Sequence, residues 1–210
     1  MEKNPSSADE LKTIRKFMEE STKFLSLSGL SGVFPGIFAI AGAFIAWLLI
    51  LDKGNFTYEM YNSLPREATA ALRWKMILDA LSVLLLSLTA AFYFSFRRAN
   101  KSGISFWTPA SKRLLLNLFI PLITGGIFAL ILMIQNDIQL IIPVFLVFYG
   151  LALINAGKFT YNEVFYLGIF EIITGLISAF FPAQGLIFWI LGFGILHIAY
   201  GLLVYRRYEA

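Results

Sequence analysis

The stretch Leu27–Leu51 reads LSGLSGVFPGIFAIAGAFIAWLLIL and contains no charged residue. A helix rises about 1.5 Å per residue and needs about 20 apolar residues to cross about 30 Å of hydrocarbon, so this stretch can span a membrane. Stretches of the same kind follow at Met76–Phe96, Leu114–Ile134, Leu140–Gly157, Val164–Phe181 and Gly185–Val204. The sequence therefore predicts an all-α membrane protein, a bundle of six transmembrane helices.

The composition fits a membrane protein and excludes several kinds of site. Hydrophobic residues make up 58% of the chain, charged residues make up 14%, and the mean hydropathy is +0.73. The absence of cysteine excludes a thiolate nucleophile and a cysteine-ligated metal, and the single histidine excludes a histidine-cluster metal centre. Glycine-rich phosphate loops and the Gly-x-Ser-x-Gly motif of serine hydrolases are absent as well. We therefore expect no enzymatic activity, no metal and no cofactor.

The basic residues predict how the bundle is oriented. With six spans, both termini and the loops at 97–113 and 158–163 share one side of the membrane. That side carries 13 of the 17 Lys and Arg residues, and the other side carries only Lys53, Arg66, Arg73 and Lys75. The positive-inside bias places both termini in the cytoplasm and the loop at 52–75 outside. The net charge of +4 fits anionic lipid headgroups, and no nucleic-acid motif accompanies it, so the lipid bilayer is the expected partner.

The N-terminal residues 1–26 precede the transmembrane domain, which comprises residues 27–210. Ser7 followed by Glu10 is a capping-box pattern, and apolar residues recur at helical spacing from there to Phe24. We expect an amphipathic helix on the cytoplasmic membrane surface. This helix either anchors the first span or binds a membrane protein partner.

A short repeat links the spans in pairs. The tripeptide Gly-Ile-Phe occurs at Gly36, Gly126 and Gly168, each time in an odd-numbered span. The spans that follow the last two copies share Gly, Ile and Gly at identical offsets, in Gly150–Gly157 and Gly194–Gly201. The pattern predicts three tandem helical hairpins, which are parallel repeats because two spans return the chain to the same side.

The last hairpin resembles a known family. The segment Tyr166–Pro182, YLGIFEIITGLISAFFP, and the following Gly192, Gly194 and Gly201 are similar to the two-helix unit of HdeD-like acid-resistance membrane proteins. The likeness covers the last third of the chain well and the first third poorly, because residues 52–75 form a longer connection. The resemblance implies a small bacterial inner-membrane protein connected with envelope stress, and it carries over no catalytic residue.

Small residues line one face of the first span. Gly29, Gly32, Gly36, Ala39 and Ala43 follow one another at offsets of three and four. In lipid, helices associate through close van der Waals contact, which small residues permit. The face therefore packs either against another helix of the same chain or against a second copy in a homo-oligomer.

Two polar residues lie inside the second and third spans. Asp79 is near the outer boundary of its span, where it can reach headgroups or pair with Arg73 or Lys75. Asn117 shares a face with Thr124, which is the arrangement expected of residues that line a cavity. Polar residues in a membrane are costly unless they are paired or hydrated, so both are candidates for an intramembrane polar site.

Glu171 and His197 are the strongest candidates for an intramembrane polar site. They lie about 12 residues before and about 14 residues after the centre of the turn at Pro182–Gly185, which places them at similar depth in an antiparallel hairpin. A carboxylate beside an imidazole can carry a proton, yet the same pair can simply fasten two helices.

Two functions from different classes fit these observations. The first is a non-enzymatic membrane protein with a structural, stress-related or regulatory role. The second is a small transporter or channel whose polar path runs through Glu171, His197, Asn117 and Asp79. Convergence of at least three of these side chains on one cavity would favour the transporter, and scattered positions would favour the first function. A membrane enzyme would need a cleft that opens at the headgroup region.

Overall fold

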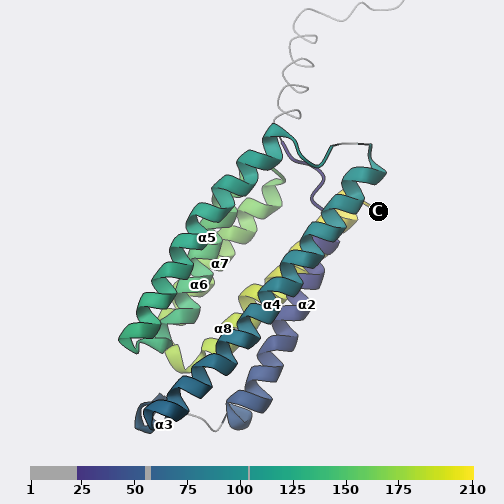
Figure 1. Ribbon diagram of the computed structural model, residues 1–210. Coiled ribbons are helices and arrows are strands. Elements are labelled where there is room, and N and C mark those ends of the chain that lie inside the picture. Colours follow the sequence, from purple (N-terminus) through teal and green to yellow (C-terminus); the bar gives the residue numbers. More distant parts are fainter. Residues whose placement is uncertain (1–22, 55–57, 104) are drawn as a thin grey trace, which may run out of the picture.

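The computed structural model describes residues 23–54, 58–103 and 105–210 (Figure 1). Within these ranges every regular element is helical, which confirms the predicted all-α class. Elements α2 (Leu30–Ile45) and η1 (Ala46–Ile50) form the first span, and α4 (Arg66–Lys101) forms the second. The predicted amphipathic helix falls almost entirely on residues 1–22, which lie outside the described ranges.

The remaining elements complete six helices that are long and apolar enough to cross a membrane. The third span is α5 (Pro109–Gln135), the fourth comprises η3 (Ile138–Leu140) and α6 (Ile141–Gly157), and the fifth is α7 (Asn162–Phe180). The sixth comprises η4 (Pro182–Gln184), α8 (Gly185–Trp189), η5 (Ile190–Leu196) and α9 (His197–Tyr208). The multi-pass architecture predicted from hydropathy is therefore confirmed.

The connection at 52–75 differs from the predicted loop because much of it is helical. Its described part contains η2 (Asp52–Gly54), α3 (Tyr58–Ser63) and the first ten residues of α4. Pro65, with φ −57° and ψ 151°, precedes α4, and Glu67 lies in its first turn, where a negative charge interacts favourably with the helix dipole. The hydropathy pattern places the start of the second span at Met76, although the helix α4 begins ten residues earlier, at Arg66.

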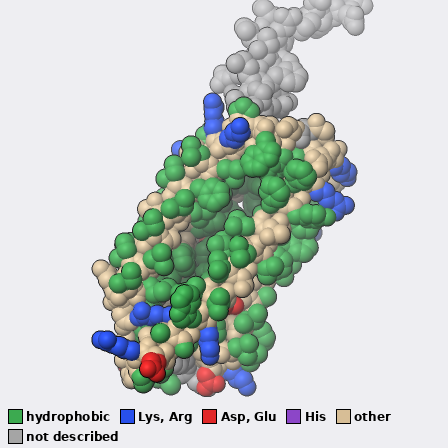
Figure 2. Space-filling view, viewed as in Figure 1, with side chains coloured by type: hydrophobic (Ala, Val, Ile, Leu, Met, Phe, Trp, Pro, Cys, Tyr) green, Lys and Arg blue, Asp and Glu red, His purple; other side chains and the backbone are tan. Residues whose placement is uncertain are grey.

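The bundle consists of two groups of helices (Figure 1). In one group α2 packs against α4 on one side and against η5 and α9 on the other, and in the second group α6 packs between α5 and α7. Contacts of α7 with η5 and α9 join the groups. The surface is hollowed between them, with hydrophobic side chains around the hollow (Figure 2). A shallow groove on the α4 side is lined by Leu88, Phe92 and Phe96 together with Thr89 and Tyr93.

Glycines lie at two close crossings of helices. A Cβ added to Gly36 of α2 would lie 2.7 Å from the carbonyl oxygen of Gly194 in η5, and one added to Gly29 would contact Gly201 of α9. Between α6 and α7, a Cβ on Gly150 would lie 2.6 Å from the carbonyl oxygen of Gly168. Only glycine permits such close approach of two backbones, so these positions fix which helices pair.

The small-residue face of α2 is therefore occupied within the chain. Gly29, Gly32 and Gly36 face α9 and η5, and Ala39 and Ala43 are each 2% exposed. Of the two alternatives that the sequence left open, the structure places this face against other helices of the same chain. A homodimer seam along it would require α9 to leave.

The Gly-Ile-Phe repeat corresponds to a repeated contact at two of its three copies. At Gly36 and at Gly168, an added Cβ would meet the glycine carbonyl of the partner helix and the isoleucine four residues after it, Ile198 or Ile154 respectively. At Gly126, the third copy, an added Cβ would meet nothing within 4 Å. Two of the three copies of Gly-Ile-Phe therefore lie at a close helix crossing of the same kind.

Candidate functional site

Glu171 is the central residue of α7, the helix Asn162–Phe180. Its helix carries a polar face of Glu171, Thr174 and Ser178, and all three side chains are buried, with Glu171 0% exposed. The Thr174 hydroxyl donates to the carbonyl of Phe170 at 2.7 Å, within its own helix. An apolar helix thus brings one carboxyl group to the middle of the bundle, where desolvation makes an unpaired charge costly.

His197 follows the π-helix η5, in which each turn is wider than in an α-helix. Its Nδ1 lies 3.1 Å from the carbonyl oxygen of Gly192, five residues earlier. A carbonyl oxygen only accepts, so Nδ1 carries a hydrogen and Nε2 faces the opposite way. π-Helical turns are rare in proteins, but those that occur often lie at functional sites. Here the turn sets the orientation of the imidazole.

The Glu171 carboxyl and the His197 imidazole are in contact. Nδ1 lies 3.2 Å from Oε1, with the histidine side chain 7% exposed. The Nδ1–H bond is aligned with Gly192 rather than with Glu171, so this is a charge contact and not a well-directed hydrogen bond. Within the described chain neither carboxyl oxygen of Glu171 has a hydrogen-bond partner. The sequence placed the two residues at one depth, and the structure brings their polar atoms together.

Gly192 provides the room for this contact. A Cβ at Gly192 would lie 2.6 Å from Oε2 of Glu171 and would also contact the side chain of Leu146. The carboxyl group therefore sits directly against the backbone of the π-helix. Replacement by any other residue would push the carboxyl away from the imidazole.

Tyr149 completes the site from a third helix. It is the central residue of α6, its hydroxyl lies 2.7 Å from Nε2 of His197, and its ring stacks on the imidazole with centroids 5.3 Å apart. Sequence reasoning missed Tyr149. The available signal was its depth, because membrane tyrosines concentrate at the interfaces and this one is mid-span beside the repeated Gly150. We call Glu171, His197 and Tyr149 the buried triad.

Asp79 and Asn117 do not join the triad, which corrects the predicted four-residue path. The Asn117 amide donates to the carbonyl of Arg113 on its own helix at 2.8 Å. Asp79 on α4 faces α2, where a Cβ at Gly42 would lie 3.6 Å from its Oδ2. The suggested partner Arg73 donates instead to the Tyr61 hydroxyl at 2.6 Å. Only two of the four candidates therefore meet.

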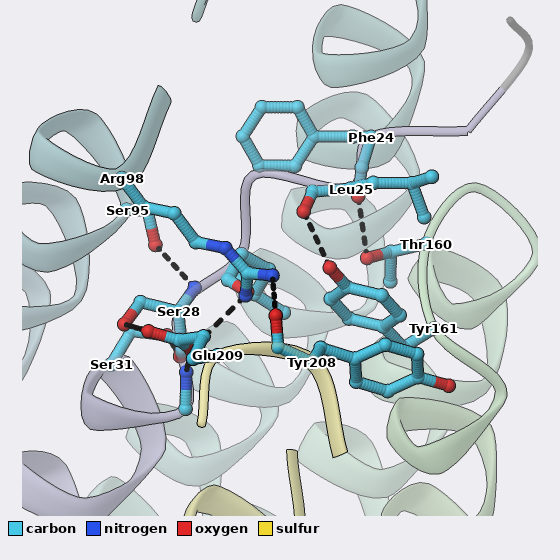
Figure 3. A network of polar contacts seen from close by, with 12 residues as sticks. Phe24, Leu25, Ser28, Ser31, Ser95, Arg98, Thr160, Tyr161, Tyr208 and Glu209 are labelled. Carbon is cyan, nitrogen blue, oxygen red and sulfur yellow. Dashed lines mark hydrogen bonds and ion pairs between the residues drawn. The ribbon is translucent and has the colours of Figure 1, made fainter. Parts of the chain in front are cut away.

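A second polar cluster occupies the end of the bundle that carries the C terminus (Figure 3). Arg98 of α4 donates to Oε1 of Glu209 at 3.0 Å, and the Ser28 hydroxyl donates to Oε2 at 3.1 Å. The amide of Gly29, at the start of α2, also donates to this carboxylate. A carboxylate at a helix N-terminus is stabilised by the helix dipole and by amides without an intrahelical acceptor.

The same cluster fixes the chain segment that enters α2. Thr160 donates to the carbonyl of Phe24 at 2.8 Å, and Tyr161 donates to that of Leu25 at 2.5 Å (Figure 3). Burial raises the pKa of Tyr161 above its ordinary value, so its hydroxyl remains protonated and continues to donate. Arg98 lies over the tyrosine ring, 5.7 Å from its centroid.

Among the described residues, no group of three or more His, Cys, Asp and Glu residues is placed to hold a metal ion. Comparisons with protein-family models, with curated proteins and with solved structures found no match for this chain. The chemistry of the buried triad therefore has to be inferred from its own geometry.

Proposed function

We propose that this multi-pass membrane protein is a non-enzymatic regulatory protein whose helix packing depends on the protonation of the buried triad. The observation that carries the proposal is the fully buried Glu171 carboxyl, 3.2 Å from the only imidazole in the chain. An intramembrane ionisable pair at mid-depth is costly to maintain, and such pairs mark functional sites more often than chance. The triad joins α6, α7 and α9, so a change in its charge acts on three helices.

The proposed response follows from the charges of the pair. With a proton on the imidazole, Glu171 and His197 neutralise each other across their 3.2 Å contact. Loss of that proton leaves the carboxylate as an isolated charge in a low-dielectric interior, which costs several kcal/mol unless the helices rearrange or the carboxyl takes up a proton. Each protonation state therefore favours a different packing of α7 against α9.

Tyr149 takes part in both states of this cycle. When Nε2 of His197 is bare, the tyrosine hydroxyl donates to it, and when Nε2 carries a hydrogen, the tyrosine oxygen accepts. The hydroxyl hydrogen must turn away from the imidazole in the second case. The state of the pair is thus transmitted to α6 through a bond of 2.7 Å.

Two expectations from the sequence support the proposed role and the proposed location. The resemblance to HdeD-like proteins implies a bacterial inner membrane and a connection with envelope stress, and the basic residues imply cytoplasmic termini. The separate positions of Asp79 and Asn117 argue against a continuous polar path, so we place the transporter alternative second. The bilayer remains the expected partner, with a homo-oligomer or another membrane protein as the receiver of the signal.

The proposal is tested by measuring thermal stability in detergent against pH for the wild type, Glu171→Gln and Asp79→Asn. We expect the wild type to lose stability as the pH rises and the imidazolium is lost, and we expect Glu171→Gln to remove that dependence. Asp79→Asn, which alters an intramembrane carboxyl outside the triad, should keep it. Identical pH profiles for the wild type and Glu171→Gln would rule out a protonation-dependent clasp.

A further inference from the structure

Two further buried hydroxyls lie on either side of the triad. Within the described chain, the hydroxyls of Tyr200 and Ser178 are buried and have no hydrogen-bond partner. Tyr200 follows His197 by three residues toward the C-terminal end, and Ser178 follows Glu171 by seven residues toward the opposite end. Buried polar atoms of this kind bind ordered water, so each hydroxyl is a candidate step on a route by which protons reach the triad.

The two routes differ in what lies between the hydroxyl and the triad. On the C-terminal side, Tyr200 and Tyr149 pack against the same apolar cluster of Leu153, Val164 and Leu167. Val164 and Leu167 precede Glu171 in α7, so Tyr200 packs at a level between the triad and the C-terminal end of the bundle.

Glu163 gives this side its access to solvent. Its carboxylate is in the first turn of α7 and accepts from Arg207 at 2.8 Å and from the Tyr208 hydroxyl at 3.1 Å. The side chain of Arg207 is 66% exposed, so the outer edge of this cluster lies at the surface. Val164 follows Glu163 directly and belongs to the apolar cluster against which Tyr200 packs.

On the opposite side an apolar side chain separates the triad from Ser178. Leu146 of α6 is 0% exposed, and its Cβ would lie 2.9 Å from a Cβ placed on Gly175. Gly175 is one turn beyond Glu171 in the direction of Ser178. The same leucine also contacts the position of a Gly192 Cβ, beside the carboxyl of Glu171. Leu146 thus fills the space between α7 and η5 directly next to the carboxyl.

We propose that the buried triad exchanges protons with one side of the membrane only, through Tyr200, and that Leu146 closes the route from the other side. In this exchange, a protonated water (H3O⁺) at Tyr200 gives its extra proton to the Tyr149 oxygen and remains as water, and Tyr149 passes its own hydroxyl hydrogen to Nε2 of His197. No covalent bond other than O–H and N–H bonds changes, and Glu171 balances the positive charge. The ligand of this site is a proton carried by water. The inference rests on the proposed function, because it assumes that the triad titrates.

All ionisable groups that face this route take part in its response to pH. Helix α6 contributes Tyr149, α7 contributes Glu171 and Glu163, and α9 contributes His197 and Tyr200. At the C-terminal end of the bundle, Arg98 of α4 lies 5.7 Å from the ring centroid of Tyr161, which precedes α7. Helix α2, which packs against α9, contains no ionisable residue between Leu30 and Ile45.

The test uses the full chain in lipid vesicles that are sorted by which end of the bundle faces outward. A pH jump is applied outside with a membrane-impermeant buffer, and the ring band of the His197 imidazole, assigned with His197→Gln, is followed by infrared difference spectroscopy. We expect a rapid change when the C-terminal end faces outward and a much slower one when it faces inward. Tyr200→Phe should slow the rapid change by about 100-fold, the lower end of what a positioned proton-transfer group contributes.

Two further variants complete the experiment. Tyr166→Phe, at a tyrosine that is 59% exposed, removes the same atom away from the route and should leave the rate unchanged. Leu146→Ala should make the triad respond from the opposite end as well. Equal responses from both ends in the wild type, or an unchanged rate in Tyr200→Phe, would overturn one-sided access but leave the proposed function standing. No titrating imidazole band from His197 under any condition would overturn both.

Discussion

The close approach of the Glu171 carboxyl to the backbone at Gly192 can be tested by substitutions at glycine positions. A Cβ at Gly192 would overlap Oε2 of Glu171, whereas a Cβ at Gly126 would meet nothing within 4 Å. We expect Gly192→Ala to destabilise the protein by about 1–3 kcal/mol, the usual cost of overpacking, and Gly126→Ala to be neutral or stabilising. Thermal unfolding in detergent measures both. Equal stability of the two variants would show that the carboxyl does not lie against the π-helix.

A double-mutant cycle tests whether Glu171 and His197 stabilise one another. Removal of one partner leaves the other polar group buried, which costs about 3 kcal/mol or more, while removal of both leaves an apolar contact. Glu171→Leu and His197→Leu should therefore lose less stability together than the sum of the single losses, and Glu171→Gln should be milder than Glu171→Leu. Strictly additive losses in chemical denaturation would mean that the pair does not interact.

At the scale of helices, the pairing of α2 with α9 depends on close backbone approach. A leucine at Gly36 would collide with the carbonyl of Gly194 and with Ile198, and should separate the helices over about one turn. We expect Gly36→Leu to lower the yield of folded protein in detergent by several-fold. Ile37→Leu is the matched control, because Ile37 is 47% exposed, whereas the neighbouring Ile40 contacts Gly194. Equal yields for the two variants would make the glycine face incidental.

The helices themselves were predictable because membrane spans depend on local composition. Hydropathy alone located the span around Glu171 and the depth of His197, since residue counts convert directly into distance along a helix. The partner of the Gly29–Ala43 face was not predictable, because a small-residue surface permits close approach equally well within a chain and between chains.

The details that shape the triad depend on contacts between helices. Tyr149 reaches His197 from a different hairpin, and no pattern within α6 indicates which helix it faces. The π-helical turn that aims His197 at Gly192 is a backbone irregularity in an otherwise ordinary apolar segment. Asp79 and Asn117 have the same polar character as Glu171, but their helix faces lead elsewhere. The sequence shows which side chains are polar. The direction in which each helix turns such a side chain depends on its packing against the neighbouring helices.

At the scale of the whole molecule, Glu209 ties the end of the chain to the first and second spans. Its carboxylate accepts from Arg98, from Ser28 and from the amide of Gly29, and its side chain is 16% exposed. Hydrogen bonds to a charged group contribute about 1.5–3 kcal/mol each where they are shielded from water, so we expect Glu209→Gln to lower stability by about 1–2 kcal/mol. Glu59→Gln, at an exposed residue, is the control. A thermal midpoint shared by Glu209→Gln and wild type would contradict a structural role for this contact.

The orientation of the bundle decides which compartment the triad can sense. The C terminus lies at one end of the bundle and α3 at the other (Figure 1), and Arg98 contacts Glu209 beside the C terminus. Thirteen of the 17 Lys and Arg residues belong to the side predicted to carry the termini, so we expect that end in the cytoplasm. Reporter fusions after Ala210 and within α3 should therefore give opposite readings, with the first cytoplasmic. The same reading for both would contradict the six-span topology. Opposite readings with the first outside would reverse the orientation, and the route through Tyr200 would then report the pH outside the cell.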